Sequence, residues 1–498
     1  MACGGDDAAA PADAAADAPA DGADATTTDQ YIAPADASKT VCTLEGDADP
    51  VFLCTQKLVL RTLHDSALAT GKGLVASWDS ITGIPDMDDA GAPAHDVHDD
   101  AAYTAACGNY ARSASRYGDT ELTAVLLADL TTLAPILRDE LATLPDEYAG
   151  RLYFHLRDTA VGLRYAGQND LGTSFDSLAD AAGAKIFAHF VPLSAPDGGT
   201  DAGDDGGADG GDEAGDAGTD AGAFTLPGAG VLAGDSTNVD YAPGDGATGA
   251  LALLDMAVRH AADDPTHAGG WALAAVESLE HAYLRGRDGA TGLYFRLLVP
   301  SSAPAHDDLS PRAPAPSDLL ATEATGDVAL ALFRAAELVT ANATLAPISP
   351  IATYPFVDRA NAALAALNGA APLFDGDAGG YAEGTLATNG ALLPNKPTRA
   401  NALLLAALHR ANVLRVTPFT RQAQVQRTVL GATSPRGASL LTVVPGQSAF
   451  FAAVAKDFTL PPSDAGLPVA HPNSFVTAAT LSAIDAFNDQ WNGDPNAP

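Results

Sequence analysis

Apolar residues recur along most of this 498-residue chain with the spacing of an α-helix. In one clear case Leu122, Val125, Leu126, Leu130 and Leu133 would form a single stripe along one helix face. Ala and Leu, which are strong helix formers, dominate these stretches, and few stretches alternate with period two. The sequence therefore predicts an all-α fold. We expect helices at 52–69, 99–117, 147–166, 174–189, 246–263, 270–286, 318–341, 356–368, 397–414 and 474–490.

Two acidic tracts interrupt the helical pattern. Residues 1–40 hold eight Asp and one Lys, and residues 194–224 hold eight Asp, one Glu and no basic residue. Both tracts lack the apolar side chains whose burial offsets the entropy lost on ordering. We therefore expect a disordered tether at 1–40 and a disordered linker at 194–224, with folded parts at 41–193 and 225–498.

Charge and missing motifs exclude several classes of protein. The formal net charge is −37, from 63 acidic and 26 basic residues. Such a chain repels phosphate backbones, which argues against a nucleic-acid partner. No run of 18 or more apolar residues is present, so a membrane-spanning helix is not expected. Phosphate-binding loops, Cys-x-x-Cys pairs and the Gly-x-Ser-x-Gly elbow are also missing from the sequence, which argues against nucleotide, thioredoxin-like and typical serine-hydrolase chemistry.

The first residues look like the junction of a bacterial lipoprotein. Ala2 is a small residue before Cys3, and a flexible acidic tether follows. The resemblance implies lipidation of Cys3 and a place in the cell envelope, periplasmic or on the outer-membrane surface, with Met1 standing in for a removed signal peptide. The alternative is an ordinary disordered tail.

Three further cysteines bear on the fold. In an exported protein Cys42 and Cys54 could close a short loop through a disulfide, which would leave Cys107 as a buried thiol. The alternative is three unpaired thiols in the core.

A short turn pattern occurs three times. Residues 79–83, 288–292 and 375–379 all read Asp-x-x-[Thr/Ala]-Gly, and each has aromatic neighbours such as Trp78 or Tyr381. Asp accepts hydrogen bonds from the backbone just ahead of it, and Gly tolerates a positive φ. We expect three helix–turn–helix units with a short β-hairpin at each turn.

Three longer motifs carry a resemblance to a known architecture. His98-Asp99-Asp100 opens a helix that ends in Tyr117-Gly118-Asp119, residues 374–381 hold an Asp-x-x-x-Gly-Gly-aromatic hairpin, and the polar segment 395–401 leads into a helix. In this order they resemble the (α/α) toroid, the six-hairpin barrel of many bacterial glycosidases and epimerases. The resemblance implies a single ring of helical hairpins with short β-hairpin turns, a glycan or small-molecule ligand and no cofactor.

The likeness to sugar-cleaving toroids has limits. An acidic linker interrupts the ring, and the chain has three tryptophans, Trp78, Trp271 and Trp491, although such enzymes usually stack sugars on aromatic rings. The sequence therefore supports two functions. One is a glycoside hydrolase or glycan-binding protein, and the other is a non-catalytic surface scaffold that binds a protein or ligand.

The densest polar segment is 95–100, which has three interpretations. Asp99 and Asp100 could form the acid pair that α-mannan-cleaving toroids use, one attacking or activating water and the other protonating the leaving oxygen. His95 and His98, with Asp96 or Asp99, could hold a divalent cation. Asp99 could also simply cap a helix on an acidic surface loop.

Other candidate site residues lie further along the chain. Glu277 could be a second acid, and its alternative is a solvated side chain or a pair with Arg285 or Arg287. The resemblance also implies aromatic residues that bind substrate. We assign this role to Trp78, Tyr103, Trp271 and Tyr381.

Overall fold

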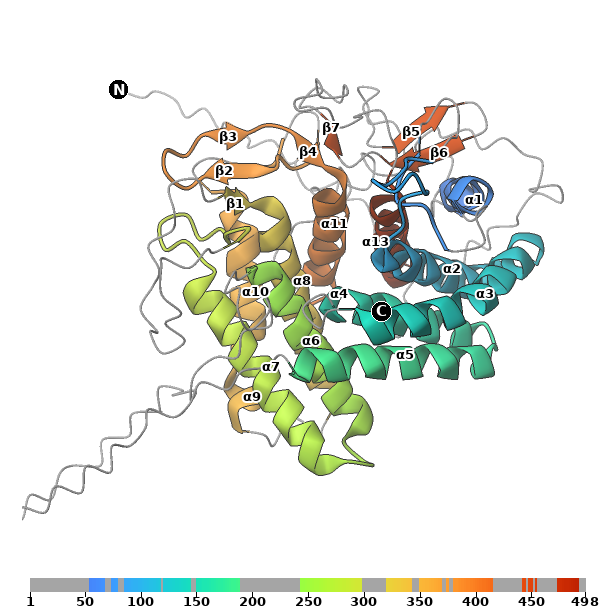
Figure 1. The fold of residues 1–498 in the computed structure, drawn as a ribbon. Helices are drawn as coiled ribbons and strands as arrows, with labels where there is room; N and C mark the ends of the chain where they lie inside the picture. Colours follow the sequence, from blue (N-terminus) through green and yellow to red (C-terminus); the bar gives the residue numbers. More distant parts are fainter. Residues whose placement is uncertain are drawn as a thin grey trace, which may run out of the picture. The chain divides into compact units, whose positions relative to one another are not determined.

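The computed structural model describes most of the first folded part and much of the second (Figure 1). The described residues are 53–67, 73–78, 85–117, 120–144, 149–188, 242–297, 319–342, 349–369, 373–375, 379–414, 441–444, 447–450, 453–454 and 473–491. The tether, the acidic linker, Cys3 and Cys42 lie outside them. The predictions of disorder, of lipidation and of a disulfide to Cys54 therefore remain predictions.

Six helices form an inner ring. Each packs against the next in chain order, and the last packs against the first, so the ring is closed. These helices are α2 (Val97–Tyr117), α4 (Ala149–Tyr165), α6 (Pro243–His260), α8 (Thr322–Ala341), α11 (Thr398–Val413) and α13 (Ser474–Trp491). The fold is an (α/α) toroid, as predicted, and residues on both sides of the acidic linker contribute to the same ring.

An outer layer of helices covers the ring. In it α3 (Glu121–Thr143) packs on α2, α5 (Asn169–Ala188) on α4, α7 (Pro265–Arg285) on α6, and α10 (Phe356–Ala366) on α8. Figure 1 shows two of these hairpins plainly, α4 with α5 and α6 with α7. The remaining outer elements are α1 (Leu53–Thr62), its π-helical continuation η2 (Leu63–Ala67), and the short α9 (Ser349–Thr353).

The helix pattern in the sequence matches the buried faces. On α3, Leu122, Leu126, Leu130 and Leu133 are buried, whereas Val125 is half-buried at the edge of the stripe. Burying a leucine contributes about 1.5–3 kcal/mol, so this stripe is sufficient to hold α3 on the ring. Cys107 of α2 is also buried and forms no disulfide, as predicted for that thiol.

Two glycines set the contact between α2 and α4. A Cβ on Gly108 would lie 2.8 Å from the Cα of Thr159, and one on Gly162 would lie 2.3 Å from the carbonyl oxygen of Gly108. The two backbones therefore touch, and any larger residue would force the helices apart.

Short strands occupy the connections that lead back to the ring. A three-stranded antiparallel sheet has the order β1 (Leu319–Ala321), β2 (Gly384–Leu386), β3 (Leu392–Leu393). Two antiparallel pairs join β4 (Lys396–Pro397) to β7 (Ala453–Val454), and β5 (Leu441–Val444) to β6 (Gln447–Phe450). Because β1 and β4 end where α8 and α11 begin, they fix the starts of these inner helices. The predicted helix at 318–341 accordingly begins later, at Thr322.

The second of the repeated turns, 288–292, is a hairpin of the predicted kind, and an antiparallel bridge joins Arg287 to Tyr294 at its base. At the third copy an antiparallel bridge joins Phe374 to Tyr381. Residues 79–83, the first copy, lie outside the described residues, so a hairpin there remains a prediction. Both bridges lie between an outer helix and the next inner helix, at the end of the ring where α8 and α11 begin.

The second of these hairpins shows how its sequence forms the turn. The Asp288 carboxylate accepts hydrogen bonds from the backbone N–H and the hydroxyl of Thr291, at 2.8 and 2.6 Å. Gly292 has a φ of +79°, a conformation that favours glycine. Asp and Gly are thus required at the two ends of the motif.

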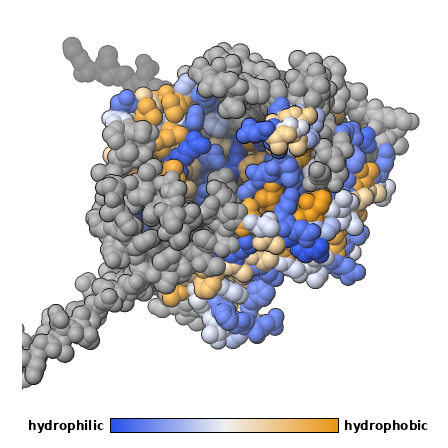
Figure 2. Space-filling view, viewed as in Figure 1, coloured by the Kyte–Doolittle hydropathy of each residue, from blue (hydrophilic) through white to orange (hydrophobic). Residues whose placement is uncertain are grey.

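The surface mixes polar and apolar residues. On the face seen in Figure 2, apolar residues lie in separate patches among hydrophilic ones. Among the described helices, none combines the length and the hydrophobicity needed to cross a membrane.

Candidate active site

Polar and aromatic side chains gather where the inner helices begin. We call the following set the ring-end cluster: His98 and Asp99 of α2, His155 of α4, Glu323 and Asp327 of α8, Arg399 of α11, and Phe475 of α13.

Arg399 links three of the inner helices. Its guanidinium pairs with the Glu323 carboxylate and lies 3.4 Å from an oxygen of Asp327, both on α8. The same group lies 5.6 Å from the centre of the Phe475 ring on α13. Asp327 in turn approaches α6, because a Cβ on Gly244 would lie 3.0 Å from its Oδ2.

Phe475 extends the cluster to α2 and α4. The rings of His98 and His155 meet it edge-on, with centroids 6.4 and 5.8 Å away. The backbone N–H of Phe475 donates a hydrogen bond to the Asp99 carboxyl. All six inner helices therefore meet at one end of the ring through a short chain of contacts.

Asp99 is a buried acid whose environment favours the protonated form. It is 3% exposed, and burial raises its pKa to about 8, with the negative charges of Asp96 and Asp100 acting in the same direction. The hydrogen bond from Phe475 opposes this shift only in part. A carboxyl that keeps its proton at neutral pH can act as a general acid.

Asp100 lies in a different environment from its neighbour. Successive residues of a helix point about 100° apart, so Asp100 faces the outer helix α3 and the loop before α2. Its Oδ1 accepts a hydrogen bond of 2.6 Å from the backbone N–H of Leu74, and its Oδ2 lies 3.6 Å from His95 Nε2. It is fully buried, and burial raises its pKa to about 7. The two adjacent carboxyls therefore do not share one environment.

The helix-cap interpretation is wrong for Asp99. The helix begins at Val97, and the residue that caps it is Asp96, whose Oδ1 accepts a hydrogen bond of 2.9 Å from the backbone N–H of His98. Asp99 is the third residue of the helix and is buried, so it does not lie on a surface loop.

The two candidate metal-binding histidines, His95 and His98, contact different residues. His95 contacts Leu74 and Glu140, whereas His98 Nδ1 lies 2.8 Å from Asp96 Oδ1. Among the described residues, the one group with metal-ligand spacing contains His95 with Asp100 and Glu140, and not His98.

Glu277 lies in the outer layer, on α7, apart from the ring that carries Asp99. It is 3% exposed, which excludes the solvated alternative, and burial raises its pKa to about 7.

None of the four predicted substrate-binding aromatics belongs to the ring-end cluster. Trp78, Tyr103 and Tyr381 are fully buried, and Tyr103 donates a hydrogen bond of 2.7 Å to Asp129 of α3. Trp271 packs against His260, the last residue of α6, at the far end of that helix from Gly244. Burial of a large aromatic ring is strongly favourable, so Trp78, Tyr103 and Tyr381 serve the core.

Most residues of the ring-end cluster could not be recognised as site residues from the sequence alone. Glu323, Asp327, His155 and Phe475 stand singly within helical stretches. Their available signals were the i, i+4 spacing of Glu323 and Asp327 and the helix start that precedes them. Arg399 lies in the polar segment 395–401 that carried the resemblance, although no role was assigned to it.

Charged pairs also lie deeper along the inner helices. Asp158 of α4 lies 3.6 Å from Arg334 of α8, and Arg410 of α11 pairs with Glu337 of α8. In the ring α6 stands between α4 and α8, so the Asp158–Arg334 pair connects two helices that are not neighbours.

No protein-family model matches this sequence, and no curated protein matches it. Solved structures share the fold. An unsaturated glucuronyl hydrolase specific for heparin is 12% identical, with 89% of this chain and 98% of that chain covered and a TM-score of 0.54. An α-1,6-mannanase of Salegentibacter sp. is 11% identical, with 88% and 99% covered and a TM-score of 0.51. That structure is an inactive variant, with asparagine in place of two adjacent aspartates, in complex with α-1,6-mannotriose.

A D-mannose isomerase also shares the fold, at 10% identity, with 91% of this chain and 98% of that chain covered and a TM-score of 0.50. At these identities the likeness shows the fold. The chain shares the (α/α)-toroid fold of these proteins.

Proposed function

We propose that this protein is a glycoside hydrolase that acts on a neutral glycan at the ring-end cluster. The observation that carries the proposal is the position of Asp99, a buried acid that accepts a hydrogen bond from the backbone of Phe475. The Phe475 ring also contacts the Arg399 guanidinium, which two carboxylates hold in place. The mannanase with the same fold is inactive when two adjacent aspartates are replaced by asparagine, which supports a catalytic role for acidic side chains in a toroid of this kind.

The two carboxyl groups that glycoside hydrolysis requires differ in charge here. Asp99 holds its proton and donates it to the leaving oxygen. Glu323 pairs with the Arg399 guanidinium, and its side chain is 36% exposed, so it can reach a substrate or a water molecule. Glu323 then attacks the sugar or activates water. No cofactor enters this reaction.

Charge favours a neutral substrate. Beside the protonated Asp99, the ring-end cluster holds two carboxylates, those of Glu323 and Asp327, against the single guanidinium of Arg399. A uronate would bring a further negative charge into this set, whereas a neutral sugar chain would not.

The test is sugar release from α-1,6-linked manno-oligosaccharides, with unsaturated glucuronyl oligosaccharides as the comparison substrate. We expect turnover of the first, and loss of that turnover in Asp99→Asn. Asp264→Asn is the control for removing an acid elsewhere, because Asp264 caps α7 and pairs with His267 outside the inner ring. Turnover of the uronate alone would refute the neutral-glycan proposal, and unchanged turnover in Asp99→Asn would refute the acid.

A second candidate is sugar isomerisation. Two imidazoles, those of His98 and His155, meet the same Phe475 ring, and imidazole is suited to moving protons near neutral pH. A D-mannose isomerase shares the fold. Conversion of D-mannose to a ketose, lost in His155→Gln while Asp99→Asn retains it, would favour this candidate over hydrolysis.

The alternative to both enzymes is a scaffold that binds a glycan or protein without turnover. Binding of manno-oligosaccharide with no product formed would support it. We also propose that the protein works in the cell envelope, held by a lipid on Cys3, which is supported by the small residue before it and the acidic tract after it. Incorporation of labelled fatty acid behind a lipoprotein signal peptide, and its loss in Cys3→Ser, tests this.

A further inference from the structure

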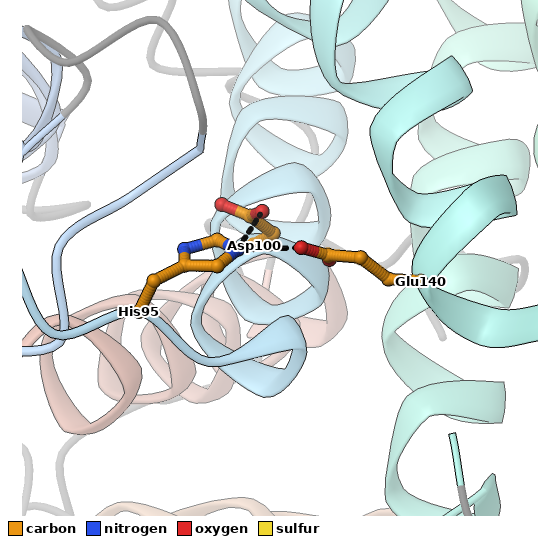
Figure 3. Close-up of side chains that lie close together, drawn as sticks. All are labelled: His95, Asp100 and Glu140. Atoms are coloured by element: carbon orange, nitrogen blue, oxygen red, sulfur yellow. Dashed lines mark hydrogen bonds and ion pairs between the residues drawn. The ribbon is translucent and has the colours of Figure 1, made fainter. Parts of the chain in front are cut away.

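Three side chains from separate segments converge beside Asp99. His95 comes from the loop before α2, Asp100 from α2, and Glu140 from the last turns of α3 (Figure 3). His95 Nε2 lies 2.6 Å from Glu140 Oε1 and 3.6 Å from Asp100 Oδ2. One nitrogen and two oxygen atoms, one from each residue, all lie within 4.8 Å of one another. We call these residues the His95 triad.

The backbone of Leu74 orients two members of the triad. Its carbonyl oxygen lies 2.8 Å from His95 Nδ1, and a carbonyl only accepts, so Nδ1 carries the hydrogen. Nε2 points the other way, toward Glu140 Oε1 at 2.6 Å, and in the metal-free protein it donates a proton to that carboxylate. Binding of an ion would release this proton and leave the Nε2 lone pair as a ligand. The N–H of the same residue donates to Asp100 Oδ1, which turns Oδ2 toward His95. Such hydrogen bonds behind the ligands are typical of metal sites.

Gly73 allows the loop to come this close. Its φ is +113°, and a Cβ there would lie 2.3 Å from Asp100 Oδ2 and 2.4 Å from His95 Cε1. Only a residue without a side chain fits at this position, so the backbone encloses the triad on this side.

The triad has buried oxygens that lack donors. Within the described part of the chain, Asp100 Oδ2 and Glu140 Oε2 are buried and accept no hydrogen bond. The Asp100 side chain is fully buried. A single imidazole N–H can serve only one carboxylate oxygen, and here the short contact is to Glu140 Oε1. Buried carboxylate oxygens without a donor are costly, whereas a cation would satisfy several at once.

We propose that the His95 triad binds a divalent transition-metal ion of the Zn²⁺ type through His95 Nε2, Asp100 Oδ2 and the Glu140 carboxylate. One nitrogen and two carboxylate ligands suit such an ion better than Mg²⁺ or Ca²⁺, which prefer oxygen alone. The side chains of His95 and Glu140 are each 28% exposed, so the ion can enter and keep a water ligand.

The ion is structural in this proposal. It links the loop of Leu74 and the start of α2 to the end of α3. Because Asp99 is adjacent to the ligand Asp100, the ion also fixes the position of Asp99. The ion takes no direct part in the proposed glycan chemistry, because neither Asp99 nor Glu323 is a ligand.

The experiment is a titration of chelator-treated protein with Zn²⁺, and separately with Mg²⁺, at about 0.15 M salt to screen diffuse binding to the acidic chain. We expect one Zn²⁺ per chain by calorimetry and by elemental analysis after dialysis, and no saturable Mg²⁺ binding. Co²⁺ should give a visible absorption band from a low-symmetry site. Zn²⁺ and Mg²⁺ uptake of equal stoichiometry, or no stoichiometric Zn²⁺, would overturn the proposal.

Variants locate the site. Glu140→Gln and His95→Gln should each weaken Zn²⁺ binding by about tenfold or more. His267→Gln is the matched control, since His267 also lies 2.6 Å from a carboxylate, that of Asp264, but on the surface of α7. Equal loss in the control would overturn the proposal. If His95→Gln fails to fold, Glu140→Gln and the Co²⁺ spectrum of the unaltered protein still decide. Turnover is measured separately, so failure here leaves the glycan proposal standing.

Discussion

Two polar regions of this toroid differ in whether their acidic side chains have partners of opposite charge. Between α4, α5 and α6, Arg157 lies 2.9 Å from Asp176 and 3.2 Å from Asp255. Arg259 lies 2.6 Å from Asp180, and the Tyr153 hydroxyl donates to Asp255 at 2.7 Å. We call this set the interlayer network. Its acids are matched by guanidinium or hydroxyl groups from neighbouring helices.

The start of α2 has the opposite character. Asp99 and Asp100 are adjacent, buried and raised in pKa by that burial, to about 8 and about 7. Asp100 Oδ2 and Glu140 Oε2 receive no hydrogen bond from the described residues. The same chain therefore builds matched ion pairs where helix layers must hold together, and leaves acids unmatched at one end of the ring.

This difference teaches how to separate structural charge from functional charge. The matched pairs of the interlayer network stabilise the fold and need no ligand to satisfy them. Acids whose pKa values are perturbed by burial carry an electrostatic cost that a substrate, a proton or a cation can relieve, and such groups concentrate at functional sites. The comparison predicts that substitutions in the two regions affect different properties.

The largest expected effect is on turnover at the ring end. Asp99→Asn should lower turnover of the glycan by about 10²–10⁴-fold, because general acid catalysis contributes that much. Asp100→Asn should lower it by about tenfold or less, since Asp100 faces Leu74 and His95 and acts by positioning. Steady-state kinetics on both variants, with melting temperatures, makes the test. Equal losses would mean that the two acids act as one pair and that their separate environments are misleading.

The next effect is on stability in the interlayer network. Asp176→Ala should lower the free energy of unfolding by about 3 kcal/mol, because it leaves Arg157 without one of its carboxylates in a largely buried site. Turnover per folded molecule should not change. Asp139→Ala is the control, since its pair with Arg138 is exposed and should contribute less than about 1 kcal/mol. Denaturant unfolding measures both variants, and a loss of turnover in folded Asp176→Ala would break the division between the two regions.

The sequence predicted the architecture well because architecture depends on pattern. Leu122 to Leu133 mark a helix face whatever their partners are, and Asp288 and Gly292 form their turn through local hydrogen bonds. The motif order then indicated a toroid. Helix starts were less accurate, as at Thr322, because the pairing of β1 with β2 depends on residues more than 60 positions away.

The site was harder to predict because it depends on distant contacts. Asp99 stood out through its acidic neighbours, but nothing local indicates that Phe475 would donate to it. Likewise Glu140, at the end of an amphipathic helix, reads as an ordinary surface acid until the fold brings it to His95. The sequence also could not show which aromatic residues bind substrate, because a large apolar ring is as favourable in the core as in a binding site.

The smallest effect comes from Glu277, a buried acid that has no ion pair among the described residues and so tests whether an unmatched charge always marks function. Its pKa is raised by burial from 4.5 to about 7. The unfolded chain loses this proton above about pH 4.5 and the folded protein only near pH 7, so the stability contribution of Glu277 falls as pH rises through that window. Above that window the cost of burying ionised Glu277 is constant, at most about 3 kcal/mol from the size of the shift.

Glu277→Gln should therefore stabilise the protein at pH 8, by about 1–3 kcal/mol, and have little effect at pH 4.5. Glu280→Gln, one turn on, should destabilise instead, because it removes the partner of Arg359. We expect unchanged turnover in Glu277→Gln, because α7 lies outside the inner ring. A stabilised variant that loses turnover would return Glu277 to the catalytic candidates and would show that an acid in the outer layer can serve the ring end.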